Sequence, residues 1–447
     1  DSLQGVAAVL GSAKLLRHRD GDVKLLTACC LSDVLRIFAP ESPYENETLK
    51  MVFELFISQL RGLHDDEGAS FARYTYLVER LAMVKSFVLM LDLNFDDLVR
   101  QLVEVLLESA SEAHPIRVSG YMMSIVVTTL EELAEDGIPT PLLDAILENL
   151  LPARRAEKPA SYQLARQVLE RCADDLQQPL QAFIEGCLPT GSGLPAIESE
   201  IREEWPQLLF ELSEIMPELV TYLLPQLQAV ISSGEEGNRL QGIELLAKLF
   251  TLHNSHNVNL VHASLIHSFA SKFLDSSVPV RTAMVEHGVT LLRQLPAAHA
   301  DPILKALQGR FLDPDERVRT ALILHVCEAC AESAGPLEPL LLEVGNRVQD
   351  KKASVRSAAR SNLCALYRKH VTNTALHWIP QRLLSSYAND SSSSNSEGCR
   401  EIESLMHSTL LPSEAAARLR SLCAMHAALQ PRHRKVLHVV LLRGKRQ

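Results

Sequence analysis

The amino-acid sequence predicts an all-α protein in which antiparallel helix pairs stack into an α-solenoid. Three observations predict this fold class. No segment shows the sustained alternation of apolar and polar residues that marks a half-buried strand. Leu and Ala, which favour helices and pack well between them, dominate the apolar 47% of the 447 residues, and aromatic residues make up only 5%. Finally, one short motif recurs along the chain at a nearly constant spacing.

The recurring motif is an Asp followed six residues later by an Arg, with a Val directly before the Arg. Three segments carry it: "FLDSSVPVRTAMVEHGVTLL", "FLDPDERVRTALILHVCEAC" and "VQDKKASVRSAARSNLCALY". The pairs are Asp275 and Arg281, Asp313 and Arg319, and Asp350 and Arg356, so the arginines are 38 and then 37 residues apart. A period of about 40 residues is typical of stacked helix pairs of the HEAT or armadillo type.

Each residue of the motif has a predicted structural role. The Asp is expected in the turn between two helices, where its carboxylate can cap the following helix. The Val begins the buried face of that helix. The Arg can reach an Asp or backbone carbonyls in a neighbouring repeat, so the three arginines are expected to form a ladder along the stack. We favour this structural role over a binding role for them.

Weaker copies of the motif occur earlier in the chain. Arg239 holds the Arg position 42 residues before Arg281, Asp20 precedes Val23, and Ile116 precedes Arg117. We therefore predict a HEAT-repeat array of roughly nine to ten repeats over residues 1–375.

Residues 376–447 break the pattern and are predicted to form a helical insertion near the C-terminal end. The segment contains a Ser/Asn-rich run from Asn389 to Gly398, whose composition predicts a flexible loop, followed by basic helices. Residues 415–447 carry eight Lys or Arg and no acidic residue. Both ends of the chain suggest that it is part of something longer.

Composition and charge exclude several classes of protein. The net charge of −11 argues against a protein whose whole surface grips nucleic acid. No apolar run reaches the roughly 18 residues of a membrane-spanning helix. The nine cysteines are odd in number and mostly lie in apolar helical runs, which favours a reducing compartment and buried thiols. Cys327 and Cys330 are assigned to core packing rather than to a redox or zinc site.

No constellation of catalytic residues is recognisable, so we predict that the chain is not an enzyme and holds no metal. The sequence lacks a nucleophile elbow, a kinase motif set and a dinucleotide-binding fingerprint. The histidines His253, His256, His262 and His267 do not show the spacing of a zinc protease. Stacked repeats instead offer long surfaces that bind extended peptides or other proteins.

The stretch "VLRIFAPESPY" is the most informative candidate site. Pro40 removes a backbone donor and ends the preceding helix at Ala39. Pro43 stiffens the corner, and a stiff corner loses little entropy when it binds a partner. We expect it to present Phe38, Glu41 and Tyr44 as a preorganised patch.

Several segments together resemble one family. They are Asp22–Tyr44, Arg73–Phe87, Leu142–Arg155, Leu245–Phe250, Val278–Arg281, "LYRKH" and "LLPSEAAARLRSLCAMHAAL". These segments are similar to the N-terminal part of the cohesin regulators called precocious dissociation of sisters, which are HEAT-repeat proteins of sister-chromatid cohesion. The similarity runs through nearly all of the chain, and it implies that the chain is a fragment.

The resemblance implies a non-enzymatic nuclear scaffold that binds the kleisin subunit of cohesin, the wings-apart-like release factor and the protector sororin. It also implies support of cohesin acetylation and contact with chromatin through these partners. The family's proline element corresponds to residues 39–43, with Ser42 in place of the usual Ala. The partner-binding residues implied by the resemblance are Phe38, Ala39, Pro40, Glu41, Pro43 and Tyr44.

The resemblance further implies an inositol hexakisphosphate site in a basic pocket. Six phosphates require several convergent cations, and the candidates are Lys85, Lys248, Arg432, Arg434 and Lys435. Alternative interpretations remain at this stage. They are another HEAT-repeat adaptor such as a transport receptor, phosphatase scaffold or coat protein, an enzyme with an unrecognised site, and direct DNA contact at the basic end.

Overall fold

The computed structural model describes residues 2–189, 200–252, 263–295, 297–333, 337–371, 373–392 and 395–443. These residues contain helices and connecting turns but no strand, which confirms the predicted all-α class. Contacts divide the chain into two units, residues 1–226 and 227–447, and the division falls within helix α15. None of the described helices combines the length and the apolar character needed to cross a lipid bilayer.

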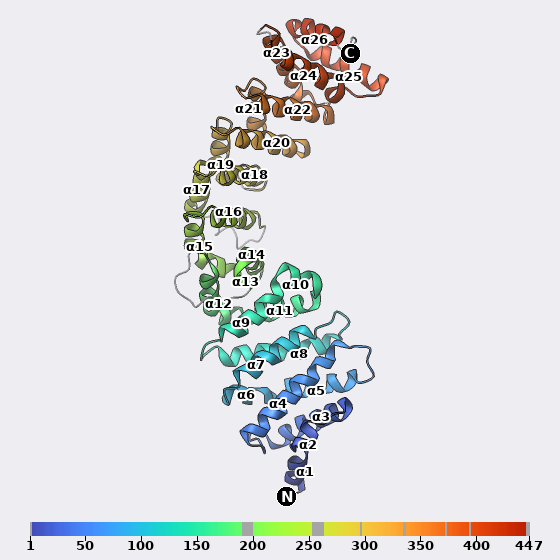
Figure 1. Cartoon of the computed structure of the whole chain (residues 1–447), viewed down its shortest axis with the longest axis vertical. Coiled ribbons are helices and arrows are strands. Elements are labelled where there is room, and N and C mark those ends of the chain that lie inside the picture. Colours follow the sequence, from blue (N-terminus) through green and yellow to red (C-terminus); the bar gives the residue numbers. More distant parts are fainter. Residues whose placement is uncertain are drawn as a thin grey trace. The chain divides into compact units, whose positions relative to one another are not determined.

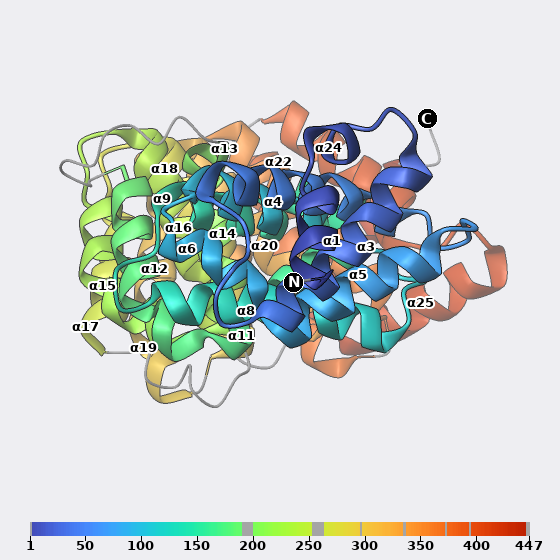
Figure 2. The same ribbon diagram turned by 90° about the horizontal axis from the view of Figure 1, so that it is seen from below.

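The first unit stacks its longer helices in two layers (Figure 1). One layer contains α3, α5, α8 and α11, in which each helix contacts the next, and the other contains α4, α7 and α9. Figure 2 shows α3 and α5 side by side. The helices of this unit are α1 (Ser2–Leu10), α2 (Ala13–Leu16), α3 (Gly21–Phe38), α4 (Asn46–Leu60), α5 (Phe71–Val84), α6 (Leu89–Asp92), α7 (Asp96–Glu108), α8 (Ile116–Leu133), α9 (Thr140–Leu147), α10 (Pro152–Glu157), α11 (Pro159–Arg171), α12 (Ala173–Cys187), α13 (Glu200–Glu203), α14 (Trp205–Ile215) and α15 (Pro217–Ile231).

The second unit repeats the same two-layer plan. The even-numbered helices from α16 to α22 pack one upon the next, and α17, α19 and α21 form the second layer. The helices are α16 (Glu236–Thr251), α17 (Ala263–Ser271), α18 (Val278–Gln294), α19 (Ala297–Arg310), α20 (Glu316–Glu332), α21 (Glu338–Arg347), α22 (Ala353–Lys369), α23 (Trp378–Ser392), α24 (Ser396–Leu405), α25 (Ala415–Ala428) and α26 (Pro431–Arg443). A side chain at Gly288 would lie 2.6 Å from the Phe273 ring, so glycine is required where α18 meets this ring.

The predicted ladder of arginines joins the repeats of the second unit. Arg239 donates to Asp275 at 3.1 Å, Arg281 to Asp313 at 2.9 and 3.1 Å, and Arg319 to Asp350 at 3.1 Å. Each Arg also donates to carbonyls in its own turn, as Arg281 does to the carbonyl of Asp275 at 2.7 Å. The ladder therefore ties each turn to itself and to the next repeat.

The expected capping role of the Asp is wrong in detail. The carboxylate of Asp275 accepts from the backbone N–H of Ser277, and that of Asp313 accepts from Asp315, each at 2.9 Å. Ser277 and Asp315 are themselves the residues that cap α18 and α20. The Asp therefore closes the turn two residues before the cap, and its remaining lone pairs are free for the Arg of the preceding repeat.

The prediction that Arg356 extends the ladder to a neighbouring repeat is wrong. Arg356 donates only to the carbonyls of its own turn, Asp350 at 2.8 Å and Lys351 at 3.2 Å, among the described residues. One turn further along α22, the buried Arg360 pairs with Asp390 and Glu401, each at 2.7 Å. This is where the sequence repeat also ends. The boundary between residues 375 and 376 stays a prediction.

The Ser/Asn-rich run is not one loop. Residues 389–392 belong to α23, and α24 begins at Ser396, where the Asn395 side chain accepts from the N–H of Gly398 at 3.2 Å. Arg360 holds this end of α23 through Asp390 at 2.7 Å and through Ser386 at 2.9 Å. A buried ion pair therefore overrides the loop-forming composition of the run.

We predict that Asp313→Ala lowers the free energy of unfolding by about 3–5 kcal/mol, since it leaves the guanidinium groups of Arg281 and Arg310 without their carboxylate in a buried turn. Asp301→Ala is the matched control, because its carboxylate is 71% exposed and, among the described residues, pairs with Lys305 alone, a contact worth at most about 1 kcal/mol. Urea denaturation followed by circular dichroism measures both. Equal losses in the two variants would contradict a stabilising ladder.

Candidate functional site

The corner between α3 and α4 contains the predicted partner-binding element. Helix α3 ends at Phe38, where Pro40 prevents its continuation, and α4 begins at Asn46. Ala39, Pro40 and Glu41 are exposed, and the following residues up to Tyr44 are partly exposed. The corner thus offers backbone and side chains to solvent without belonging to a helix.

A cavity of about 130 Å³ lies against this corner. Residues 39–42 form one side of it. The other walls come from α3 near its end and from the end of α5 with the residues that follow it. These walls are mostly apolar, and their uncharged residues are Leu35, Val84, Ser86, Val88 and Leu89. The cavity also has two charged lining residues, Glu41 and Lys85.

Lys85 ends α5 in a left-handed conformation, with φ of 54°, and its N–H donates to the carbonyl of Leu81 at 2.9 Å. The structure therefore brings together Glu41, predicted to bind partner proteins, and Lys85, predicted to bind polyphosphate. The periodicity of the sequence gave no sign of this convergence, because Glu41 and Lys85 are 44 positions apart in the sequence. The apolar walls, Val84, Val88 and Leu89, were also missed.

Tyr44 anchors the corner instead of lining the cavity. Its hydroxyl donates to the carbonyl of Ala7 in α1 at 3.1 Å, and burial raises its pKa to about 12. A side chain at Gly11 would lie 2.7 Å from the Tyr44 ring, so this ring packs directly against the turn between α1 and α2. Phe38 and Pro43 flank the corner outside the cavity lining. Their role in partner binding stays a prediction.

The other predicted polyphosphate ligands lie in the second unit. Lys248 on α16 pairs with Glu244 at 2.9 Å. Arg434 on α26 donates to the carbonyls of Leu429 at 2.9 Å and Ala427 at 3.2 Å, so it caps the end of α25. Arg432 and Lys435 are exposed on the same helix as Arg434. The polyphosphate site stays a prediction.

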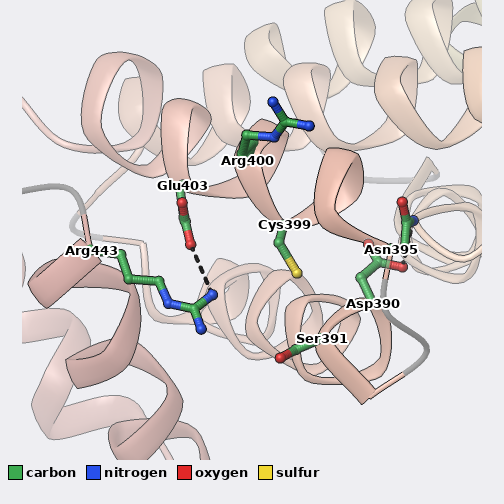
Figure 3. A pocket seen from close by; sticks show the side chains of 7 residues that line it. All are labelled: Asp390, Ser391, Asn395, Cys399, Arg400, Glu403 and Arg443. Atoms are coloured by element: carbon green, nitrogen blue, oxygen red, sulfur yellow. Dashed lines mark hydrogen bonds and ion pairs between the residues drawn. The ribbon is translucent and has the colours of Figure 1, made fainter. Parts of the chain in front are cut away.

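A second cavity, of about 420 Å³, lies among α23, α24 and α26 (Figure 3). Glu403 accepts from the Tyr387 hydroxyl at 2.6 Å and pairs with Arg443 at 3.7 Å, whereas Arg400 points away from this pair. Burial raises the pKa of the Cys399 thiol. The lining residues are Asp390, Ser391, Asn395, Cys399, Arg400, Glu403 and Arg443. Among the described lining residues, Glu403 is engaged by Tyr387 and Arg443, and the raised pKa of Cys399 disfavours its thiolate, so neither residue has the features of an activated nucleophile.

A third cavity, also of about 420 Å³, lies in the first unit between α8 and α11. Its wall is mostly uncharged and includes Met123, Leu164 and Ile116, and Ile116 is 92% exposed. The buried His114 also lines this cavity, and its Nε2 hydrogen-bonds with the carbonyl of Leu63 at 2.8 Å. This histidine is therefore used for packing between repeats.

Six of the nine cysteines are buried, whereas Cys29 is partly exposed and Cys30 and Cys423 are exposed. Burial raises the pKa of Cys29, Cys172, Cys187 and Cys330 to about 11 and that of Cys364 to about 12, and it also raises the pKa of Cys327. Within the described part of the chain, no group of His, Cys, Asp and Glu side chains is arranged to hold a metal ion. His253, His256 and His262 lie outside the described residues.

We predict that iodoacetamide near neutral pH labels the exposed Cys30 and Cys423 in the native chain but labels Cys327 and Cys330 slowly. A raised pKa leaves less thiolate, which is the reactive form, and burial blocks access. Peptide mass mapping before and after denaturation measures the labelling. Rapid native labelling at Cys327 or Cys330 would contradict their assignment to the core.

We also predict that Tyr44→Phe speeds amide hydrogen exchange in α1, because the variant lacks the hydroxyl that bonds to Ala7, a contact worth about 1 kcal/mol. Tyr222→Phe, at a tyrosine that is 52% exposed, is the control. Exchange in α1 that is the same in both variants would show that Tyr44 does not anchor the corner.

Comparisons with known proteins identify the family. The family model described as "Sister chromatid cohesion protein PDS5 protein" matches residues 1–447. The chain is 31% identical over 446 residues to sister chromatid cohesion protein PDS5 homolog A of Homo sapiens, covering 97% of this chain and 32% of that protein. Homolog A of Arabidopsis thaliana is 29% identical over 428 residues, covering 93% of this chain and 26% of the relative.

A solved structure, "Structure of the Pds5-Scc1 complex and implications for cohesin function", has the same fold. Its TM-score is 0.74 at 21% sequence identity, and the match covers 98% of this chain and 69% of that one. This chain spans between a quarter and a third of the length of the curated relatives it matches. Its family is nevertheless established over its whole length: the chain belongs to the PDS5 family of sister chromatid cohesion proteins.

Proposed function

We propose that this chain is a non-enzymatic scaffold that regulates cohesin on chromatin in the nucleus. In this role it docks the kleisin subunit and, through the corner cavity, short segments of a wings-apart-like release factor or a sororin-like protector. Family membership supports the cohesin role, and the named Pds5–Scc1 complex supports a kleisin partner.

The corner cavity is the observation that carries the docking role. At about 130 Å³ it is too small for a typical small-molecule site, which has roughly 300–1,000 Å³. Its apolar walls suit one inserted side chain, and Glu41 and Lys85 suit flanking charged or polar groups of an extended peptide. Tyr44 holds the corner in place, so little conformational entropy is lost on binding.

The described residues support binding more than catalysis. The buried thiols have raised pKa values, as at Cys364, where the value is about 12. The ladder carboxylates, such as Asp313, are already bonded to two arginines. Neither set supplies a free nucleophile or general base. The alternative function, another HEAT-repeat adaptor, would share the stacked repeats but would not bind a kleisin or a release factor.

Glu41→Lys is predicted to weaken binding of a release-factor segment at least tenfold, because it reverses a charge that lines the cavity. Glu45→Lys is the matched control, since Glu45 is exposed, makes no side-chain cap bond and lies outside the cavity lining. Fluorescence polarisation with a labelled release-factor fragment measures both affinities, and a kleisin fragment is titrated in parallel.

The two titrations test kleisin docking and release-factor docking separately. Loss of the release-factor segment in Glu41→Lys, with kleisin binding kept, supports two docking surfaces. If the unmodified chain binds neither fragment, the cohesin function is wrong. Equal binding by both variants would place the docking site elsewhere. Arg434 is avoided as a test position because its guanidinium caps α25.

A further inference from the structure

The corner contains a Ser-Pro dipeptide, Ser42-Pro43, and Ser42 lines the corner cavity. We propose that Ser42 is a phosphorylation site for a proline-directed protein kinase, and that its phosphate pairs with Lys85 and closes the corner cavity. The effect on partner binding rests on the proposed function, whereas the modification and the pairing with Lys85 do not.

The local structure makes Ser42 a suitable substrate. It lies in a non-helical segment between α3 and α4, it is partly exposed, and Pro43 follows it directly. Its Oγ accepts a hydrogen bond from the N–H of Tyr44 at 3.2 Å, and no described acceptor takes the hydroxyl proton. The oxygen is therefore held in place while its proton remains available for transfer.

The chain provides a matched comparison at Thr140. The sequence has two Ser/Thr-Pro dipeptides, and the second is Thr140-Pro141. Thr140 is exposed, but it begins α9, with Pro141 in the first turn of that helix. A kinase that binds its substrate as an extended segment would have to unwind this turn, so Ser42 is the favoured site of the two.

The residue three positions after Ser42 is Glu45, which is acidic. A proline-directed kinase that requires a basic residue at this position is therefore disfavoured. The reaction transfers the γ-phosphoryl group of ATP: a bond forms between Ser42 Oγ and phosphorus, and the bond from phosphorus to the bridging oxygen of ADP breaks. ADP leaves, and the hydroxyl proton passes to the catalytic base of the kinase.

The surroundings of Ser42 determine where the phosphate lies. A phosphoserine carries a charge of about −1.5 to −2 at neutral pH and three acceptor oxygens. Ser42, Glu41 and Lys85 all line the same cavity, and Lys85 is the one cation among its lining residues. Glu41 repels the phosphate and Lys85 attracts it, so the phosphate is directed across a cavity of about 130 Å³ and blocks an apolar side chain.

The modification is tested on the full chain with ATP and a proline-directed kinase that tolerates an acidic residue at the third following position. Intact mass and site mapping are expected to show one phosphate on Ser42. Ser42→Ala removes this phosphate and Thr140→Ala retains it. Phosphate on Thr140 alone, or none on the native chain, would overturn the proposal.

The pairing is tested by phosphorus NMR titration of the modified chain. Lys85 is expected to lower the second pKa of the phosphate, and Lys85→Gln to raise it again. The same pKa in both chains would overturn the closure of the cavity. This measurement uses no partner, so it decides the pairing even if the proposed docking function fails.

The consequence is tested with the labelled release-factor fragment. Phosphorylation of Ser42 is expected to weaken its binding at least tenfold, and the phosphorylated Lys85→Gln chain to show a smaller loss. If the unmodified chain binds the fragment and phosphorylation changes nothing, the regulatory role is wrong. If the unmodified chain does not bind, the docking function fails and the mass and NMR results decide the phosphorylation and the pairing.

Discussion

The stacking depends on hydrogen bonds in which a side chain of one repeat pairs with a buried polar group of a neighbouring repeat. In the second unit it is the ladder from Arg239 to Asp350, in which each guanidinium joins two turns. In the first unit Ser161 donates to the carbonyl of Leu107 at 2.7 Å in the same way. Because an unpaired buried charge or donor is costly, these bonds specify how successive helix pairs meet.

The proposed docking at the corner requires the opposite property, since the polar groups there must face solvent. Pro40 stops α3 at Phe38, because a proline cannot continue the helix. The residues that follow are therefore not packed against a neighbouring helix as part of α3. Tyr44 then secures the corner to α1, and the cavity opens between the end of α3 and the residues that follow α5. A rigid stack therefore presents a small preorganised site on a non-helical segment.

The sequence predicted the fold class, the repeat and the ladder, since a period of 38 and 37 residues places Arg281 and Asp313 in successive turns. The sequence could not show that Asp315, two residues after Asp313, caps α20, because both aspartates lie in the same short turn. Nor could composition show that Arg360 would hold residues 389–392 in a helix. The corner was found from its prolines, but its apolar wall required the structure, since periodicity does not show which distant side chains converge.

We propose above that the corner cavity docks a short segment of a cohesin release or protection factor. Amide hydrogen exchange of the whole chain, with and without a saturating release-factor fragment, tests it most directly. New protection is expected in two segments that are distant in sequence, residues 35–42 and 84–89, which contain the residues that line the cavity. Protection confined to other helices, with these two segments unchanged, would contradict it.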